Sequence, residues 1–280
     1  MRLAAARLAA RGLAWLPWRQ RVRLALGLMR LLARSTIVPD GPCRCTACGA
    51  RLARFIADYG RAPASRLLGI TGTADNPRLY GGAARLACPV CLELERTRFL
   101  LDRLGHEGHL GEAAPPRRIL VCSGGPAVLA RLARHDVVSA NLGRTLFADT
   151  ACDLRAAPFA DATFDLVLCS FVLGAIDDEA AALSELRRIL RPGGEAWIIV
   201  PIDLAAPTTQ EGRGQPDAVR AARFGSAAHQ RLYGLDAARH FAAAGFRVRE
   251  VVARAVLAPA AIAEQGIQPE ERLFRAQPAR

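Results

Sequence analysis

The stretch DLRAAPFADATFDLVLCSFVLGAIDDEAAALSELRRILRPGGEAWIIVP, residues 153–201, decides the fold of this chain. It begins as a loop and continues at Phe164 into a buried apolar strand, which is followed by a segment with apolar residues at helical spacing. A Pro-Gly-Gly turn at 192–194 then leads into a second apolar strand. A strand, a helix and a second strand in this order are typical of one half of an α/β nucleotide-binding fold.

The segments on either side extend this alternation of strands and helices. After a strand at 119–122, Ser123, Gly124 and Gly125 can turn tightly, and Pro126 suits the first turn of a helix. Further strands are predicted at 137–140, 246–253 and 272–275, with a helix over 235–244 and a linker over the Ala- and Pro-rich residues 255–263. The fold class is therefore α/β.

The composition predicts a folded protein with a large excess of arginine. A chain of 280 residues can form one large α/β domain with a smaller module, and a hydrophobic content of 51% supports a well-buried core. The formal charge is +12, and every one of the 38 basic residues is arginine. A GC-rich genome accounts for this composition, although an acidic partner such as nucleic acid or an anionic membrane would also exploit it.

Residues 1–38 hold eight arginines and no acidic residue. They predict a basic amphipathic helix or pair of helices, broken or kinked at Pro17. The apolar runs are too short to cross a bilayer, and the segment lacks the features of a secretory or mitochondrial signal. Two alternatives stay open, since the helix can pack over the rest of the protein or lie on an anionic membrane surface. We expect a cytoplasmic protein, with peripheral membrane contact as the second alternative.

Four cysteines before residue 100 have the spacing of a metal site. Cys45-x-x-Cys48 and Cys88-x-x-Cys91 each place two thiolates on one tight turn, called a knuckle below. Two knuckles together supply four sulfur ligands at tetrahedral angles, which suits Zn²⁺ in a structural site with no open position.

The spacing also leaves alternatives to this metal site. The knuckles are separated by about forty residues, longer than the usual spacing, so residues 59–80 are expected to form an inserted loop. Disulfide pairing and a chance cluster of free thiols are the other interpretations, and a cytosolic location disfavours the first. Cys43 is a substitute ligand for Cys45.

The amino-acid sequence of residues 153–201 closely resembles the second half of class I S-adenosylmethionine-dependent methyltransferases of the type 11 kind. The residues that carry the resemblance are Asp153 and Leu154, Pro158 and Phe159, Phe164 and Asp165, and the Arg-Pro-Gly-Gly of 191–194. The resemblance implies a Rossmann-like, mostly parallel sheet whose last strand is antiparallel. A subgroup with two N-terminal knuckles shares the pattern of Cys88, Pro89, Cys91, Arg96 and Arg98.

The resemblance also implies where the cofactor, S-adenosylmethionine, would bind. The first strand and its turn approach the methionine part, which implies Cys122, Ser123 and Gly124 as cofactor-binding residues. Asn141 follows the second strand, where most relatives carry an acidic residue for both ribose hydroxyls. Because an amide has only one acceptor oxygen, this replacement is expected to weaken binding by about 1.5–3 kcal/mol.

Three further residues complete the predicted cofactor site. By resemblance, Asp153 accepts a hydrogen bond from the adenine amino group and Leu154 stacks beside the ring. Cys169 lies at the carboxyl end of its strand, where ligands bind in open α/β sheets. Relatives often carry a Glu-His pair after this strand, whereas residues 172–176 read VLGAI here.

The Gly-rich, polar residues 208–236 interrupt two well-patterned segments and predict a substrate loop. Part of this loop, residues 224–236, resembles the signature FGxxxHxRxYGxD of the same subgroup. The matching residues are Phe224, Gly225, His229, Arg231, Tyr233, Gly234 and Asp236. His229 is the candidate general base and Arg231 an anion anchor, with Tyr233 as the third predicted catalytic residue. Alternatively, His229 and Tyr233 only brace the loop by hydrogen bonds.

The resulting hypothesis is a methyltransferase with an unidentified acceptor, S-adenosylmethionine as its cofactor and a structural Zn²⁺. Its domains are predicted as a basic segment at 1–38, a knuckle module at 39–100 and a Rossmann-like domain at 101–280. The alternative is a protein that keeps this fold without catalysis and binds nucleic acid, a membrane surface or a protein partner.

Overall fold

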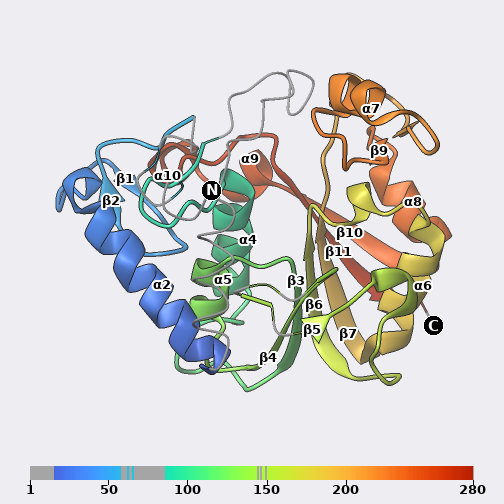
Figure 1. Ribbon diagram of the computed structural model, residues 1–280, viewed down its shortest axis with the longest axis horizontal. Helices are drawn as coiled ribbons and strands as arrows, with labels where there is room; N and C mark the ends of the chain where they lie inside the picture. Colours follow the sequence, from blue (N-terminus) through green and yellow to red (C-terminus); the bar gives the residue numbers. More distant parts are fainter. Residues whose placement is uncertain are drawn as a thin grey trace.

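A seven-stranded sheet in the order β10-β11-β7-β6-β3-β4-β5 forms the centre of the molecule (Figure 1). The computed structural model describes residues 16–57, 62, 65, 86–143, 145, 147, 148 and 150–279. The strands of the sheet are β3 (Arg118–Cys122), β4 (Asp136–Asn141), β5 (Thr150–Ala151), β6 (Phe164–Ser170), β7 (Leu190–Ile199), β10 (Phe246–Val252) and β11 (Arg272–Pro278).

Five neighbouring strands of this sheet are parallel. β3 pairs in parallel with both β4 and β6, and the parallel order continues to β5 on one side and β7 on the other. β11 pairs antiparallel with β7 and with β10. The predicted Rossmann-like sheet with an antiparallel last strand is thereby confirmed. Because the chain leaves β3 and β6 toward opposite sides, their carboxyl ends form the switch point where open α/β sheets bind ligands.

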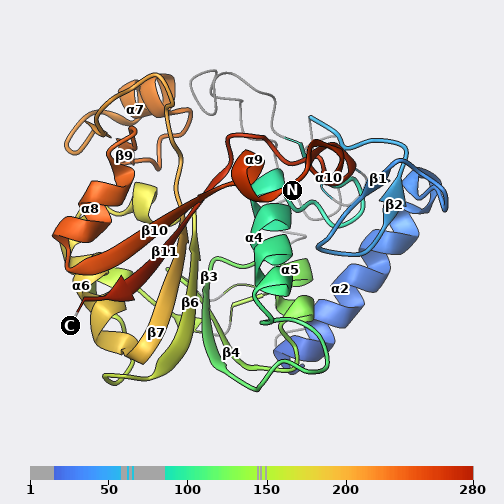
Figure 2. The same ribbon diagram turned by 180° about the vertical axis from the view of Figure 1, so that it is seen from behind.

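Helices cover both faces of the sheet (Figures 1 and 2). One face carries α2 (Trp18–Leu32), α4 (Glu95–His106) and α5 (Pro126–Arg131), and the other carries α6 (Glu179–Ile189) and α8 (Ala237–Ala243). Alternation along β3 serves both layers, since Ile119 and Val121 enter one core while Leu120 and Cys122 enter the other. This pattern explains why the strand reads as a continuous apolar run.

Two local predictions were wrong. The Pro-Gly-Gly segment does not precede β7 as a separate turn but lies within it, because Leu190 pairs with Phe164 and Glu195 with Leu166. The four residues between form an irregularity in which residues 191–193 are exposed and Gly194 is buried. The predicted linker at 255–263 is largely helical, as α9 (Ala253–Val256) and α10 (Pro259–Gln265) occupy it.

The knuckle module shares its core with the sheet. Cys45, Cys88 and Cys91 belong to the same buried cluster as Phe99 of α4 and Ile119 of β3. Its other regular element is the hairpin of β1 (Cys43–Arg44) and β2 (Arg51–Leu52). The predicted domain boundary at residue 100 falls inside α4, so the module and the sheet are joined by a continuous helix.

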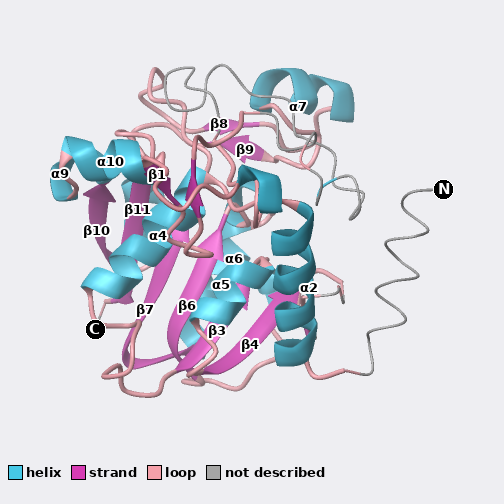
Figure 3. Cartoon of the chain, turned by 90° about the vertical axis from the view of Figure 1, so that its left-hand side faces the viewer, coloured by secondary structure: helices cyan, strands magenta, loops and turns pink. Residues whose placement is uncertain are grey.

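The predicted substrate loop lies beyond the carboxyl ends of the parallel strands (Figure 3). It contains β8 (Gln210–Glu211), α7 (Asp217–Phe224) and β9 (Arg231–Leu232). Residues 1–15 of the basic segment and most of the predicted loop at 59–80 lie outside the described residues. Among the helices that the structure describes, none has both the length and the apolar character needed to cross a membrane.

Candidate cofactor site and cysteine cluster

Four cysteine sulfurs converge between the knuckles. The Sγ atoms of Cys45, Cys48, Cys88 and Cys91 all lie within 4.8 Å of one another. The Cys45 and Cys91 sulfurs are 3.7 Å apart, and those of Cys48 and Cys88 are 3.8 Å apart. A tetrahedral Zn²⁺ with Zn–S bonds of about 2.3 Å requires sulfurs about 3.8 Å apart, so this donor set fits the ion. Cys43, the predicted substitute ligand, lies outside the cluster with its sulfur near the Ala53 carbonyl.

Both knuckles use the same backbone turn. The amide of Gly49 donates to the Cys45 carbonyl at 2.8 Å, and the amide of Leu92 donates to the Cys88 carbonyl at 2.9 Å. Gly49 has φ 75° and Leu92 has φ 64°, so in both knuckles the residue four positions after the first cysteine takes the left-handed conformation. Glycine accepts this conformation freely, whereas a leucine held there shows that the second turn is fixed by its surroundings.

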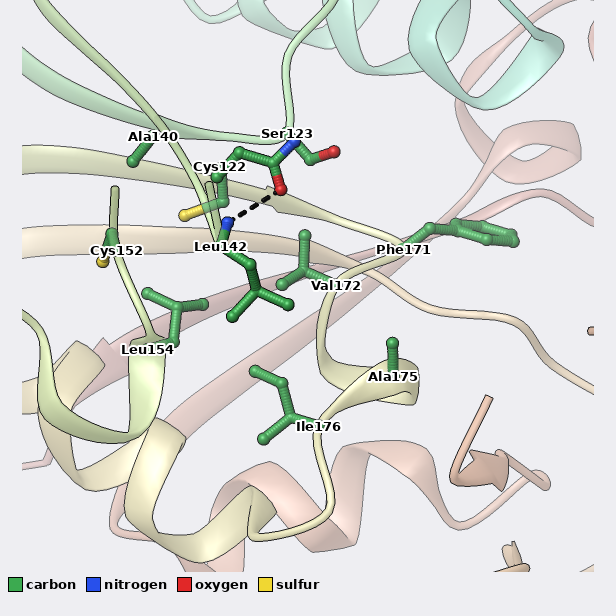
Figure 4. Close-up of a pocket in the computed structure, with 11 residues that line it drawn as sticks. Cys122, Ser123, Ala140, Leu142, Cys152, Leu154, Phe171, Val172, Ala175 and Ile176 are labelled. Atoms are coloured by element: carbon green, nitrogen blue, oxygen red, sulfur yellow. Dashed lines mark hydrogen bonds between the residues drawn. The ribbon is translucent and has the colours of Figure 1, made fainter. Parts of the chain in front are cut away.

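An apolar cavity of about 160 Å³ lies at the carboxyl ends of β3 and β4 (Figure 4). The side chains of Leu142, Leu154, Val172 and Ile176 gather around it, while that of Phe171 points away from this group. The complete lining is Cys122, Ser123, Ala140, Asn141, Leu142, Cys152, Leu154, Phe171, Val172, Ala175 and Ile176. An apolar pocket with few polar groups suits a flat ring system such as a purine.

The structure brings four of the predicted cofactor residues to this cavity. Cys122, Ser123, Asn141 and Leu154 line it directly. The Asn141 Oδ1 accepts a hydrogen bond from the Leu142 amide at 2.9 Å, which leaves the amide nitrogen as the group able to donate to a ligand.

Two other predicted residues stand behind the lining. Cys169 is fully buried in the core beneath the cavity. The Asp153 carboxylate is held by Arg155, whose Nη2 lies 2.6 Å from Asp153 Oδ2 and whose Nη1 lies 2.7 Å from Asp177 Oδ1. Arg155 thereby joins the two loops that contribute Leu154 and Ile176 to the cavity, and the hydrogen bonds from its side chain and backbone amide lower the pKa of Asp153. Asp153 has its carboxylate engaged in fixing this wall.

A second, polar cavity of about 230 Å³ adjoins the first and shares Cys122, Ser123 and Phe171 with it. The predicted cofactor residue Gly124 lines this second cavity. Its remaining lining is Glu93, Arg96, Thr97, Leu100, Val121, Gly125, Val128, Leu168 and Ser170. The two cavities together form one elongated site with an apolar half and a polar half.

Two residues shared by both cavities have strained backbones. Ser123 has φ 60° and Phe171 has φ 59°, in the left-handed region that non-glycine residues seldom adopt. Ser123 directly follows β3 and Phe171 directly follows β6. Such strain concentrates at functional sites, where the surrounding structure holds it in place.

The predicted catalytic residues occupy a separate position. The Arg231 guanidinium is buried and bound by Glu211 at 2.9 Å and by the carbonyl oxygens of Leu173, Ile176 and Asp177 at 2.6–3.1 Å. These partners engage all three of its nitrogens, so the side chain supports the wall formed by residues 173–177. No lining of the two cavities includes Arg231.

Tyr233 and His229 also make internal contacts. The Tyr233 side chain is fully buried and its hydroxyl donates to Glu179. Burial, reinforced by the Glu179 charge, raises the pKa of Tyr233 well above its ordinary value. The His229 Nδ1 lies 3.0 Å from the Phe224 carbonyl oxygen. This geometry agrees with the bracing role that was left open for both residues.

Sequence reasoning missed several residues in each half of the lining. Leu142, Val172 and Ile176 are apolar residues at strand ends, which the sequence alone does not distinguish from core residues. Glu93 and Arg96 come from the knuckle module, about thirty residues before the glycine turn they approach. The only available signal was the Arg-x-Arg pattern after the second knuckle.

The strand order, the antiparallel β11 and the cavities at the carboxyl ends of β3 and β4 define a Rossmann-like fold of the class I methyltransferase type. Residues 122–198, from the end of β3 to the end of β7, match the family model described as Methyltransferase domain. This match supports the methyltransferase type of the fold over this stretch.

The chain is also similar to individual methyltransferases. It is 28% identical over 131 residues, 44% of this chain, to the ubiquinone/menaquinone biosynthesis C-methyltransferase UbiE of Cellvibrio japonicus. It is 46% identical over 48 residues, 17% of this chain, to the protein of that name from Xanthomonas oryzae pv. oryzae. The match spans about half of the first relative (52%) and about a fifth of the second (19%).

Among solved structures, the chain is similar to the 1,6-didemethyltoxoflavin-N1-methyltransferase of Burkholderia thailandensis with bound 1,6-didemethyltoxoflavin and S-adenosylhomocysteine. The TM-score is 0.43 at 16% sequence identity, covering 66% of this chain and 77% of that one.

Proposed function

We propose that this protein is an S-adenosylmethionine-dependent methyltransferase. The observation that carries the proposal is the elongated site at the switch point of the sheet, within the stretch that matches the methyltransferase domain. Its apolar half suits the adenine ring, between Leu142, Leu154 and Ile176. Asn141 lines the same half, and its amide nitrogen can donate a hydrogen bond to a ribose hydroxyl.

Methyl transfer requires little acid-base catalysis by the protein. S-adenosylmethionine, when bound, would supply an activated methyl group for transfer to a nucleophilic atom of the acceptor, with S-adenosylhomocysteine as the leaving group and a proton released where the acceptor carries one. The protein has to align the acceptor and exclude water. The apolar wall formed by Val172, Ala175 and Ile176 helps to exclude water.

We further propose that the four-cysteine cluster binds one structural Zn²⁺. The two sulfur–sulfur distances of 3.7 and 3.8 Å and the matching turns support this proposal. With four thiolate ligands the ion has no open position for substrate. Its effect is to fix the second knuckle, which leads directly into α4 and the polar half of the site.

Calorimetric titration with S-adenosylmethionine and S-adenosylhomocysteine tests the cofactor proposal. Ala175 is exposed and lines the apolar cavity, so Ala175→Trp should obstruct the site and abolish micromolar binding while the protein stays folded. Ala180→Trp, on an exposed position of α6, is the matched control and should bind as the wild type does. Absence of binding by the wild type would refute the proposal.

An exposed face of α2 favours a second function, contact with an anionic membrane surface. Leu24, Leu28 and Leu31 recur at helical spacing and are 54%, 45% and 61% exposed. Arg23 and Arg30 are exposed on the same helix, which has no acidic residue. Exposed leucines beside arginines suit insertion at a lipid headgroup boundary better than contact with nucleic acid.

Vesicle flotation tests this second function. Vesicles with 30% phosphatidylserine should retain the wild type, and Leu24→Ser/Leu28→Ser should release it at equal salt. Neutral vesicles should retain neither protein. If the double variant remains bound, or if the wild type binds only nucleic acid, the membrane proposal is contradicted.

A further inference from the structure

The polar half of the site contains buried polar atoms without a partner. Glu93 Oε1 and Ser170 Oγ are shielded from solvent and lack a hydrogen-bond partner among the described residues. Both residues line the same cavity. Because an unpaired buried polar atom is costly, the presence of two of them on residues that line one cavity favours a polar ligand there.

The fold holds Glu93 firmly against the glycine turn of β3. Its carbonyl oxygen accepts from the Cys88 amide at 3.0 Å and from Arg98 Nη1 at 2.8 Å. A Cβ on Gly125 would lie 2.3 Å from Glu93 Oε1, so the absence of a side chain at this position makes room for the carboxylate. The knuckle module therefore delivers an acidic group to the strand end, where β3 itself offers only Val121 and Cys122.

Arg96 supplies the opposite charge to the same cavity. Its guanidinium carbon lies 4.0 Å from the centre of the Phe171 ring, at the boundary between the two cavities. A guanidinium carries its N–H donors in its own plane, and two of them along one edge match the two oxygens of a carboxylate. The polar cavity thus offers one carboxylate and one guanidinium.

We infer that Glu93 and Arg96 of the knuckle module bind the amino-acid end of the cofactor. Glu93 accepts from the α-ammonium group and Arg96 donates to the α-carboxylate. This inference rests on the proposed cofactor and goes beyond it, because it makes the module a part of the cofactor site. The pair discriminates ligands that carry a free amino acid from those that carry adenosine alone.

The test compares S-adenosylhomocysteine with 5′-methylthioadenosine, which lacks the amino-acid end, by calorimetry. Metal-replete wild type should bind the first ligand at least tenfold more tightly than the second. Glu93→Gln and Arg96→Gln should each weaken S-adenosylhomocysteine binding about 10- to 100-fold and change 5′-methylthioadenosine binding less than twofold.

Glu95→Gln is the matched control, because the Glu95 carboxylate in the same segment accepts from the Leu86 amide at 2.9 Å and does not line the cavity. It should leave the affinity ratio of the two ligands unchanged. An unchanged ratio in Glu93→Gln and Arg96→Gln, or equal affinities in the wild type, overturns the inference while the cofactor proposal stands. Wild type that binds neither ligand overturns both.

Discussion

Two segments of this protein carry similar polar motifs and use them differently. Residues 93–98 follow the second knuckle, and residues 229–233 lie in the Gly-rich insertion. The insertion looked like the reactive segment, yet its Arg231 is bound by internal oxygen atoms on every side. In the knuckle segment, Arg98 is bound in the same way, by four carbonyl oxygens, whereas Arg96 lines the polar cavity.

The comparison shows that position in the fold, and not residue type, separates the arginines that connect distant segments from the one that lines the polar cavity. Arg98 and Arg231 are both buried and each joins segments distant in the chain. Arg98 connects the knuckle module to Gln265 and Gly266 at the end of α10, and Arg231 connects β9 to residues 173–177. Each of these two guanidiniums gives four of its five N–H donors to internal oxygen atoms, and such a buried side chain stabilises the fold.

Removing the metal should have the largest effect on this comparison. We expect elemental analysis to find one Zn²⁺ per chain. Because the free energy of metal binding stabilises the folded module, chelation should destabilise the module by more than about 5 kcal/mol. Since the second knuckle positions Glu93, chelation should also weaken S-adenosylhomocysteine binding at least tenfold. Cys43→Ser lies outside the cluster and should retain both metal and affinity. A metal-free protein with full affinity would break the proposed link.

Arg231→Met should follow as a stability defect. The change leaves the Leu173, Ile176 and Asp177 carbonyls and Glu211 without their donor, so the free energy of unfolding should fall by about 3–5 kcal/mol in urea denaturation. The affinity of the folded protein for S-adenosylhomocysteine should change less than threefold. Unchanged stability together with lost methyl transfer would instead restore Arg231 to the predicted catalytic set.

Asn141→Asp sharpens the comparison from the apolar half of the site. One carboxylate oxygen can keep the Leu142 amide as its donor while the other accepts from a ribose hydroxyl. We expect S-adenosylhomocysteine to bind about tenfold more tightly, or about 1.4 kcal/mol, measured by calorimetry. Asn141→Leu is the opposing variant and should weaken binding. Weaker binding by Asn141→Asp would place the ribose elsewhere.

Asp165 provides a smaller reference effect outside both segments. Although partial burial opposes it, the Arg118 amide at 2.7 Å and Arg191 at 2.9 Å lower the pKa of the Asp165 carboxyl. Because the pKa is lower in the folded state, the ionised Asp165 stabilises the folded protein at pH values above its unfolded pKa of about 4. This stabilisation is lost as the pH falls through the folded-state pKa.

Asp165→Asn should therefore reduce stability at pH 7 by about 1 kcal/mol or less, because the pair is largely exposed. The difference from wild type should shrink as the pH falls below about 4, as followed by thermal unfolding between pH 3 and 7. A constant difference over this range would mean that the ion pair does not contribute through charge.

The sheet was predictable because its signal is local and periodic. The apolar runs that became β3 and β6 and the helical spacing of α6, together with the family resemblance, predicted the mostly parallel sheet with an antiparallel last strand. The bulge in β7 was not predictable in the same way. Pro192, Gly193 and Gly194 indicate a turn, whereas pairing with β6 on both sides of them keeps the strand continuous.

The site was less predictable than the fold. Leu154 and Asn141 were predicted from the family resemblance, and both line the apolar cavity. Glu93 was not predicted because only tertiary folding brings it beside Gly125, and the internal partners of Arg231 could not be foreseen because they come from residues 173–177. A sequence states which residues can bind a ligand, but the contacts made on folding decide which of them remain available.

A crystal structure of the metal-replete protein with S-adenosylhomocysteine tests the central claim most directly. The account predicts the adenosine between Leu142, Leu154 and Ile176, and the amino-acid end beside Glu93 and Arg96. Ligand density in the reverse orientation, or beside Arg231 and His229, would contradict the account.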